Sequence, residues 1–389
     1  MPAVCPVLWR EAVCRSSAIQ MTQPLPMTLT QVAEALGGTL HGQGDLIIRR
    51  PVHPARAEAG EGVTDLAVAM EPALLAALDG SAARAALVAG GAVPPAGSVD
   101  GWIEVGRPRF AMHVITNRFE QPARLAPGIH PSAVVEEGAE IGEGAALGPF
   151  VHVGFGARVG AGSRVHSGVS IGAGAVVGAD CLLHPGVRIG ERVRVGDRVI
   201  LHANAVIGAD GFSFVTPEPG SVESAKATGR VDAINSRLAR IASLGAVVLG
   251  DDVEIGANTC IDRGTLDDTR IGDGTKIDDM VMIGHNVRVG RLCMLCAQVG
   301  IAGSAVIGDG VVLAGRVGVA DHITIGDNAV VGAGSGVGSN IPPRSVWMGY
   351  PALPKDQATE HYLFSRRLKH LFKDVSELKK RIRSLTVPS

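Results

Sequence analysis

A period of six residues constrains this chain more than any other feature. Between residues 129 and 207 an aliphatic residue occurs at every sixth position, fourteen times in succession. A second series begins at residue 249, slips by four residues within 263–269, and continues from 271 to 337. An amphipathic helix repeats every 3.6 residues and a strand every two, so neither explains this period.

Short strands joined by tight corners do explain it, because the aliphatic residue then points inward and glycine occupies the bend. Three hexads form one triangular coil of 18 residues, and coils stack at about the strand spacing of 4.8 Å. The 29 hexads therefore predict roughly ten coils. Aromatic residues make up only 3% of the chain, and glycine is abundant at 52 residues. The predicted fold is mainly β, a parallel β-helix with a narrow aliphatic core.

Four further segments surround or interrupt the repeat. Residues 1–26 are an N-terminal extension, and 27–126 have the mixed pattern of a small α/β domain. The β-helix spans 127–350, with an inserted loop at 209–248 that is rich in Pro, Gly, Ser and charged residues. Residues 351–389 form a C-terminal helical extension. A long inserted loop such as 209–248 is usually either functional or disordered.

The C-terminal extension has an apolar seam at alternating steps of four and three residues. Its members are Phe364, Leu368, Leu371, Val375, Leu378, Ile382 and Leu385. Such a seam needs a partner, which is either the same helix of other subunits or the rod itself. The segment is also basic, and Arg366 and Arg367 are candidates for docking an acidic protein.

Composition excludes several classes of function. A net charge of -2 argues against a broad nucleic-acid surface. The sequence has no run of 18 apolar residues that would span a membrane, and its first 20 residues lack the apolar core of a signal peptide. Cys293 and Cys296 form a CxxC without the second pair that a zinc site needs. We therefore expect a cytoplasmic protein without a bound metal.

A longer stretch makes the pattern specific. Residues 249–289 read LGDDVEIGANTCIDRGTLDDTRIGDGTKIDDMVMIGHNVRV, and 206–212 read VIGADGF. Together they resemble UDP-3-O-(3-hydroxyacyl)glucosamine N-acyltransferases of lipid A biosynthesis, and the resemblance extends over about 27–385. It implies a left-handed β-helix and a homotrimer with active sites in grooves between neighbouring subunits. It also implies that acyl carrier protein delivers a 3-hydroxyacyl thioester to UDP-3-O-acylglucosamine, without any other cofactor.

Amide formation from a thioester needs a base for the amine and a donor for the oxyanion. Histidine suits the first task because its pKa lies near neutral pH. His285 lies in the IGHNV motif, and the resemblance assigns it the role of general base. Gly303 follows 18 residues later, one coil above, and corresponds to the family's oxyanion amide. His322 follows 37 residues after His285 and is the predicted auxiliary histidine.

Two polar residues near His285 are candidates for substrate binding. Asp278 precedes it by seven residues, around a corner of the same coil, and either orients the histidine or contacts the sugar. Asn286 is a second candidate for a sugar contact. For both residues, a solvated or turn-stabilising role is the alternative.

Three other histidines have a different spacing. His166, His184 and His202 recur every 18 residues, so they should stack as a ladder about 5 Å apart. The γ-class carbonic anhydrases of this superfamily bind zinc through three histidines, but rings in a regular ladder are too far apart to reach one ion at about 2 Å. We therefore expect a structural ladder.

The sequence departs from the family at one place. The family usually places aromatic residues against the uracil ring in the region that matches 63–78, whereas this chain reads VTDLAVAMEPALLAAL there. Leu66, Met70 and Leu74 are the apolar residues that remain to cover the base. The alternatives to N-acyl transfer are a related sugar O-acyltransferase, a sugar N-acetyltransferase using coenzyme A, and a non-catalytic or zinc-binding β-helix.

Overall fold

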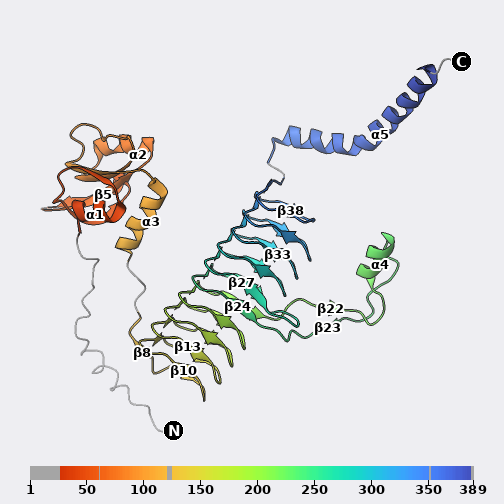
Figure 1. The fold of residues 1–389 in the computed structure, drawn as a ribbon, viewed down its shortest axis with the longest axis horizontal. Coiled ribbons are helices and arrows are strands. Elements are labelled where there is room, and N and C mark those ends of the chain that lie inside the picture. Colours follow the sequence, from red (N-terminus) through yellow and green to blue (C-terminus); the bar gives the residue numbers. More distant parts are fainter. Residues whose placement is uncertain (1–26, 61, 121–124, 350–351, 387–389) are drawn as a thin grey trace, which may run out of the picture. The chain divides into compact units, whose positions relative to one another are not determined.

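The computed structural model describes residues 27–60, 62–120, 125–349 and 352–386 (Figure 1). Contacts divide the chain into two units, 1–124 and 125–389. The predicted boundary after residue 126 lies close to this division. The predicted N-terminal extension, 1–26, lies outside the described residues.

The first unit is an α/β domain built on one sheet with the strand order β1-β3-β5-β6-β7-β2, and β4 pairs with β5. Strands β3, β5, β6 and β7 are parallel, whereas β1 and β2 pair antiparallel at the two edges. The strands are β1 (Met27–Thr28), β2 (Thr39–Gly42), β3 (Ile47–Val52), β4 (Ala59–Gly60), β5 (Val63–Ala69), β6 (Ala85–Ala89) and β7 (Gly101–Val105). The helices are α1 (Leu29–Leu36), η1 (Pro54–Arg56), α2 (Pro72–Ala76), η2 (Ala77–Gly80) and α3 (Pro108–Phe119).

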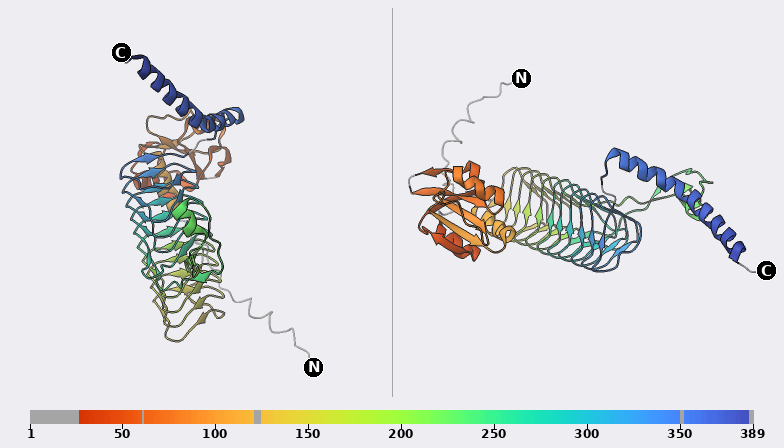
Figure 2. Two further views of the ribbon diagram at one scale, coloured as in Figure 1. Left: turned by 90° about the vertical axis from the view of Figure 1, so that its right-hand side faces the viewer. Right: turned by 90° about the horizontal axis from the view of Figure 1, so that it is seen from above.

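The second unit is the predicted left-handed β-helix, whose described strands form three parallel sheets of 9, 10 and 11 strands (Figures 1 and 2). In a typical strand, such as Arg158–Val159, the first residue points outward and the second is buried. Each such residue pairs with the one 18 positions later, as Glu140 does with Arg158. Backbone hydrogen bonds thus join every coil to the next, because a residue's strand neighbour is its equivalent one coil away.

The 10-stranded sheet carries the site and is called the groove sheet below. Its strands are β9 (Val134–Val135), β12 (His152–Val153), β15 (Ser170–Ile171), β18 (Arg188–Ile189), β21 (Val206–Ala209), β26 (Cys260–Asp262), β29 (Met282–Ile283), β32 (Gly300–Ile301), β35 (Gly318–Val319) and β38 (Gly336–Val337). The 9-stranded sheet contains β10 (Glu140–Ile141), β13 (Arg158–Val159), β16 (Val176–Val177), β19 (Arg194–Val195), β24 (Val247–Leu249), β27 (Thr269–Ile271), β30 (Arg288–Val289), β33 (Val306–Ile307) and β36 (Thr324–Ile325). The 11-stranded sheet contains β8 (Gly128–Ile129), β11 (Ala146–Leu147), β14 (Arg164–Val165), β17 (Leu182–Leu183), β20 (Ile200–Leu201), β25 (Glu254–Ile255), β28 (Lys276–Ile277), β31 (Met294–Leu295), β34 (Val312–Leu313), β37 (Val330–Val331) and β39 (Val346–Trp347).

The inward aliphatic residues form one continuous core along the coils. Val153, Ile207 and Ile283 are completely buried, whereas Ile129 in the first coil is half exposed. A coil in the middle of the stack is covered from both sides, while the first coil has a neighbour on one side only. The predicted period therefore describes the core correctly from the second coil onward.

Two irregular segments interrupt the coils. Across the four-residue slip, Glu254 pairs with Lys276, 22 positions later. The buried Arg263 occupies this slip, and its guanidinium donates to the carbonyls of Gly208 (3.0 Å) and Glu191 (2.9 Å). These two bonds tie the slip to earlier coils.

The second interruption is the inserted loop, which leaves after β21 and returns at β24. It contains the antiparallel pair β22 (Phe214–Val215) and β23 (Ala239–Arg240) and the helix α4 (Ser221–Thr228). Figure 1 shows these elements beyond the edge of the coils. Asp210 and Arg240 form an ion pair across the base of the loop.

Helix α5 (Lys355–Thr386) follows Pro354 and forms most of the predicted C-terminal extension. The seam residues Phe364, Leu368, Leu371 and Val375 are all at least 38% exposed. Among the described residues, no helix combines the length and apolarity that a bilayer-spanning segment requires.

Candidate active site

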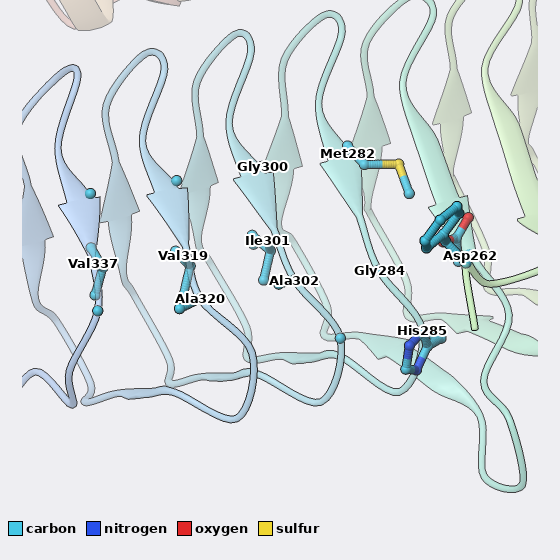
Figure 3. Close-up of a pocket in the computed structure, with 15 residues that line it drawn as sticks. Asp262, Met282, Gly284, His285, Gly300, Ile301, Ala302, Val319, Ala320 and Val337 are labelled. Atoms are coloured by element: carbon cyan, nitrogen blue, oxygen red, sulfur yellow. The ribbon is translucent and has the colours of Figure 1, made fainter. Parts of the chain in front are cut away.

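A groove of about 710 Å³ follows the groove sheet along several coils (Figure 3). One row of outward strand residues forms part of its lining, because Met282, Gly300, Gly318 and Gly336 are successive partners in register. A Cβ atom added to any of these three glycines would meet no atom within 4 Å. The row is therefore open and apolar, and Met282 stands at one end of it.

His285 lies at the Met282 end of the groove and is the second residue after β29. Two glycines face its half-buried side chain. A Cβ on Gly303 would lie 2.7 Å from the ring's Cε1 and 2.8 Å from Nε2, and a Cβ on Gly211 would lie 2.8 Å from the Cβ of His285. Both positions thus require glycine for the imidazole to occupy this place. The predicted placement of Gly303 one coil above His285 is confirmed.

Asn286 determines which nitrogen of His285 carries the proton. The Asn286 side-chain oxygen accepts the Thr265 N–H (3.0 Å), and its amide nitrogen donates to the Asp267 carbonyl (3.2 Å). Nδ1 of His285 lies 3.1 Å from the same oxygen. Since an amide oxygen only accepts, Nδ1 must donate, and the neutral ring holds its lone pair on Nε2. Nε2 and Cε1 form the edge of the ring that lies nearest to Gly303.

The two interruptions of the repeat supply the surroundings of His285. Gly211 belongs to the inserted loop, and its N–H donates to Ser243 Oγ (3.2 Å) where the loop returns. Thr265 and Asp267, which hold Asn286, belong to the slip. Residues of both irregular segments therefore contact the turn that bears His285.

Gly303 presents a backbone N–H beside the imidazole. Its neighbours are engaged, because Ala302 N–H donates to Val319 O and Ser304 N–H donates to His285 O, each at 2.9 Å. The described residues provide no acceptor for the Gly303 N–H itself. A Cβ on Gly284 would lie 2.9 Å from this nitrogen, so the absence of a side chain there keeps the space open. An oxyanion placed here would meet a donor and a base together.

Asp262 is a groove residue that the sequence analysis missed. It is 4% exposed and directly follows the inward Ile261. Burial raises its pKa to about 6, and the charge of His285 and the N–H of Phe212 oppose that rise. Its position gave a signal, because the equivalent residues in neighbouring coils are Ala209, Gly284 and Ala302.

Asp278 and His322 do not line this groove. His322 is exposed at a turn with φ 58°, and its N–H donates to Gly303 O (3.2 Å). The carboxylate of Asp278 accepts the N–H groups of Asp279 (2.8 Å) and Ala297 (3.0 Å). Within one chain, Asp278 therefore lies around the corner from His285, as predicted, and on a different face.

That face bears a second groove of about 620 Å³, which contains Asp278, His184 and His202. The predicted ladder is confirmed, because the ring centroids of His166 and His184 are 5.8 Å apart and those of His184 and His202 are 4.9 Å apart. His202 Nε2 contacts Glu254 at 2.9 Å. Burial lowers the pKa values of His166 and His184, which favours neutral, stacked rings. No set of three side chains in the described residues is arranged to hold a metal ion.

One prediction in the α/β domain was wrong. Leu66 is completely buried in the domain core and has no surface to offer a base. Strand β5 is covered on both faces, so the alternation expected of a surface strand does not apply. Met70 and Leu74 are partly buried against the domain's two core clusters.

The family model described as bacterial transferase hexapeptide (six repeats) matches residues 174–209, 268–303 and 304–339. The matched repeats are those of hexapeptide-repeat proteins, and the relatives that this chain resembles are acyltransferases. The UDP-3-O-acylglucosamine N-acyltransferase of Ruegeria pomeroyi is 50% identical over 357 residues, which are 91% of this chain and 97% of the relative. That of Paracoccus denitrificans is 49% identical over 282 residues, 72% of this chain and 76% of the relative. The chain belongs to the UDP-3-O-acylglucosamine N-acyltransferase family.

The solved structures that are similar to this chain include a UDP-N-acetylglucosamine acyltransferase from Arabidopsis. It is 24% identical, covers 57% of this chain and 71% of its own, and has a TM-score of 0.49.

Proposed function

We propose that this protein transfers a 3-hydroxyacyl chain from acyl carrier protein to the 2-amine of UDP-3-O-acylglucosamine, with His285 as general base. The observation that carries this proposal is the pairing of an Nε2 lone pair with an unengaged N–H, that of Gly303, at the end of an apolar groove. Those are the two groups that acyl transfer from a thioester requires.

In the proposed reaction, the amine attacks the thioester carbon while Nε2 of His285 removes a proton from the nitrogen. The carbonyl oxygen becomes an oxyanion and accepts the Gly303 N–H. The intermediate then collapses, the C–S bond breaks, and the imidazolium returns its proton to the departing thiolate. Asn286 keeps Nδ1 protonated throughout, so only Nε2 exchanges a proton. This orienting role fits the hydrogen bonds of Asn286 better than the sugar contact expected from the sequence.

The row of Gly300, Gly318 and Gly336 supports the groove as the acyl site. Extended hydrocarbon fits along a row without side chains, and each buried methylene contributes about 0.8 kcal/mol. From the coil that contains Gly303, the row extends two further coils to Gly336, a distance of about 10 Å. A bulky side chain in this row would shorten the acyl chain that the groove can hold.

The proposal also covers the subunit assembly, the docking of the carrier protein and the cellular location. The exposed seam of α5 supports self-association, and we propose a homotrimer in which Asp278 and His322 reach the site from a neighbouring subunit. Acyl carrier protein is acidic, so Arg366 and Arg367 on the exposed helix are its proposed contact. The reaction uses no cofactor beyond the carrier's own thioester, and we place the protein in the cytoplasm.

The test is an acceptor and donor panel with the purified protein. We expect product with 3-hydroxyacyl carrier protein and UDP-3-O-acylglucosamine, and at least about 100-fold less with acetyl coenzyme A or with an acceptor that has a hydroxyl in place of the amine. Preference for the hydroxyl acceptor would instead identify a sugar O-acyltransferase.

A further inference from the structure

We propose that Asp262 is the second proton acceptor of the site, which binds the substrate's ammonium group and removes its first proton before His285 acts. This inference rests on the proposed function, because it concerns the amine of the same acceptor. It assigns a catalytic role to a carboxyl group that the mechanism above leaves unused.

The position of Asp262 supports this role. Its strand β26 pairs in register with β29, so Asp262 lies one coil below Gly284, next to the turn that bears His285. Both side chains line the same groove, as Figure 3 shows. The register of β26 against β21 shifts just before Asp262, between Ile207 and Ala209. This irregularity places a carboxyl group where neighbouring coils have glycine or alanine.

Asp262 has few partners to neutralise it. The Phe212 N–H donates to it, and the Cys260 thiol lies 4.0 Å from its Oδ1. The like charge of Asp210 also raises the pKa of Asp262, although Asp210 is paired with Arg240. His285 is the remaining titratable neighbour. A buried carboxylate without a cationic partner is costly, and a substrate ammonium would supply the missing positive charge.

Proton balance requires a second acceptor. An amine of this kind is largely protonated below about pH 8. The ammonium must lose two protons to become an amide nitrogen, and the thiolate takes only one of them. Asp262 takes the first proton, the freed nitrogen attacks, and His285 takes the second proton and passes it to sulfur. Asp262 then releases its proton to solvent with the product. The raised pKa of Asp262 suits this acceptor role, because it reduces the difference between the pKa of the carboxyl group and that of the ammonium.

The experiment compares kcat/KM of the full-length wild type, Asp262→Asn and His285→Ala at pH 6.5 and pH 9, with acyl carrier protein as the donor. We expect Asp262→Asn to lose about 100-fold at pH 6.5. At pH 9 the amine arrives neutral and needs only one base, so this deficit should shrink to less than about 10-fold. The deficit of His285→Ala should persist at both pH values. A merely structural role for Asp262 would give the same deficit at both pH values.

Asp180→Asn is the matched control, because Asp180 is exposed in a distant coil at a turn with φ 53°, which Asn also adopts. If the wild type fails to acylate the acceptor, the proposed function is overturned. If the wild type is active and Asp262→Asn shows no deficit, or an equal one at both pH values, the role of Asp262 alone is overturned. Should Asp262→Asn not fold, Asp262→Ser replaces it under the same criteria: a deficit at pH 6.5 that shrinks at pH 9 supports the proposal, and an absent deficit or an equal one at both pH values contradicts it.

Discussion

The absence of side chains at three glycines shapes this site as much as the side chains that are present. His285 fits because Gly211 and Gly303 have no side chains, and the N–H of Gly303 stays open because Gly284 has none. Asn286 then selects the tautomer through hydrogen bonds to the slip. The chemistry of one imidazole thus depends on residues from three separate segments.

Replacing Gly303 with alanine should remove activity without unfolding the rod. The new Cβ would lie 2.7 Å from the imidazole, which must move away from the oxyanion position. We expect a loss of at least about 100-fold in kcat. Gly315→Ala is the matched control, because Gly315 occupies the same hexad position and its nearest neighbour is an ordinary contact at 3.5 Å. Equal activity of the two variants would refute this geometry.

Asp262 should make stability depend on pH in an unusual direction. Burial raises its folded pKa from the ordinary 3.8 to about 6, so folding disfavours its ionised form. The penalty is absent only well below pH 4, grows as pH rises to about 6, and stays constant above. Asp262→Asn should therefore be more stable than wild type at pH 8, by up to about 3 kcal/mol, and differ by less than about 1 kcal/mol at pH 4. Thermal unfolding at both pH values measures this, and a less stable variant at pH 8 would be contrary to it.

At the scale of elements, a strand of the rod needs only a buried aliphatic residue and a corner after it. Each coil of the groove sheet repeats its neighbour's backbone, so one row can hold Met282 and then three glycines without disturbing the stack. The groove is therefore a property of side-chain choice on a fixed frame. Its length should respond to single substitutions.

Leucine in the glycine row should shorten the acyl chain that the enzyme accepts. Gly318→Leu blocks the row one coil above Gly300, and Gly336→Leu blocks it one coil later. We expect the first variant to lose long-chain donors and the second to shift preference toward shorter ones, measured as kcat/KM over a series of acyl carrier proteins. Val306→Leu, at an outward strand position of another sheet, should change nothing. An unchanged preference in both glycine variants would place the acyl chain elsewhere.

The sequence predicted the regular elements well and the irregular ones poorly. The period is local, so 18-residue arithmetic was enough to place Gly303 beside His285 and to stack the three histidines. Gly211 and Asp262 were not predicted. Their positions depend on how the inserted loop and the slip rejoin the rod, and the six-residue period carries no information about that. Leu66 was misjudged because a strand buried on both faces has no alternation from which to identify an exposed side.

At the scale of the whole molecule, the chain leaves an apolar seam exposed on a helix of 32 residues. Isolated helices rarely present such a seam to water, because burying it against a partner is favourable. Self-association through α5 is the simplest way to cover it. In the proposed trimer, Asp278 and His322, both on the surface of one chain, would reach a site that they do not line within that chain.

Charged substitutions in the seam should weaken the assembly. The wild type should have about three times the 40.0 kDa mass of one chain in solution. Leu368→Asp combined with Leu371→Asp should shift the equilibrium toward smaller species, because burying the new carboxylates is costly. Asp374→Asn, on the same helix but outside the seam, should not. Sedimentation equilibrium measures all three, and an unaffected double variant would show that α5 does not join subunits.

The base itself gives the most direct test. His285→Ala should fold and associate as the wild type does, since the ring fills no part of the rod's core. Its kcat for transfer from 3-hydroxyacyl carrier protein to UDP-3-O-acylglucosamine should fall by about 10²–10⁴. A folded, assembled His285→Ala protein that turned over at the wild-type rate would contradict the account.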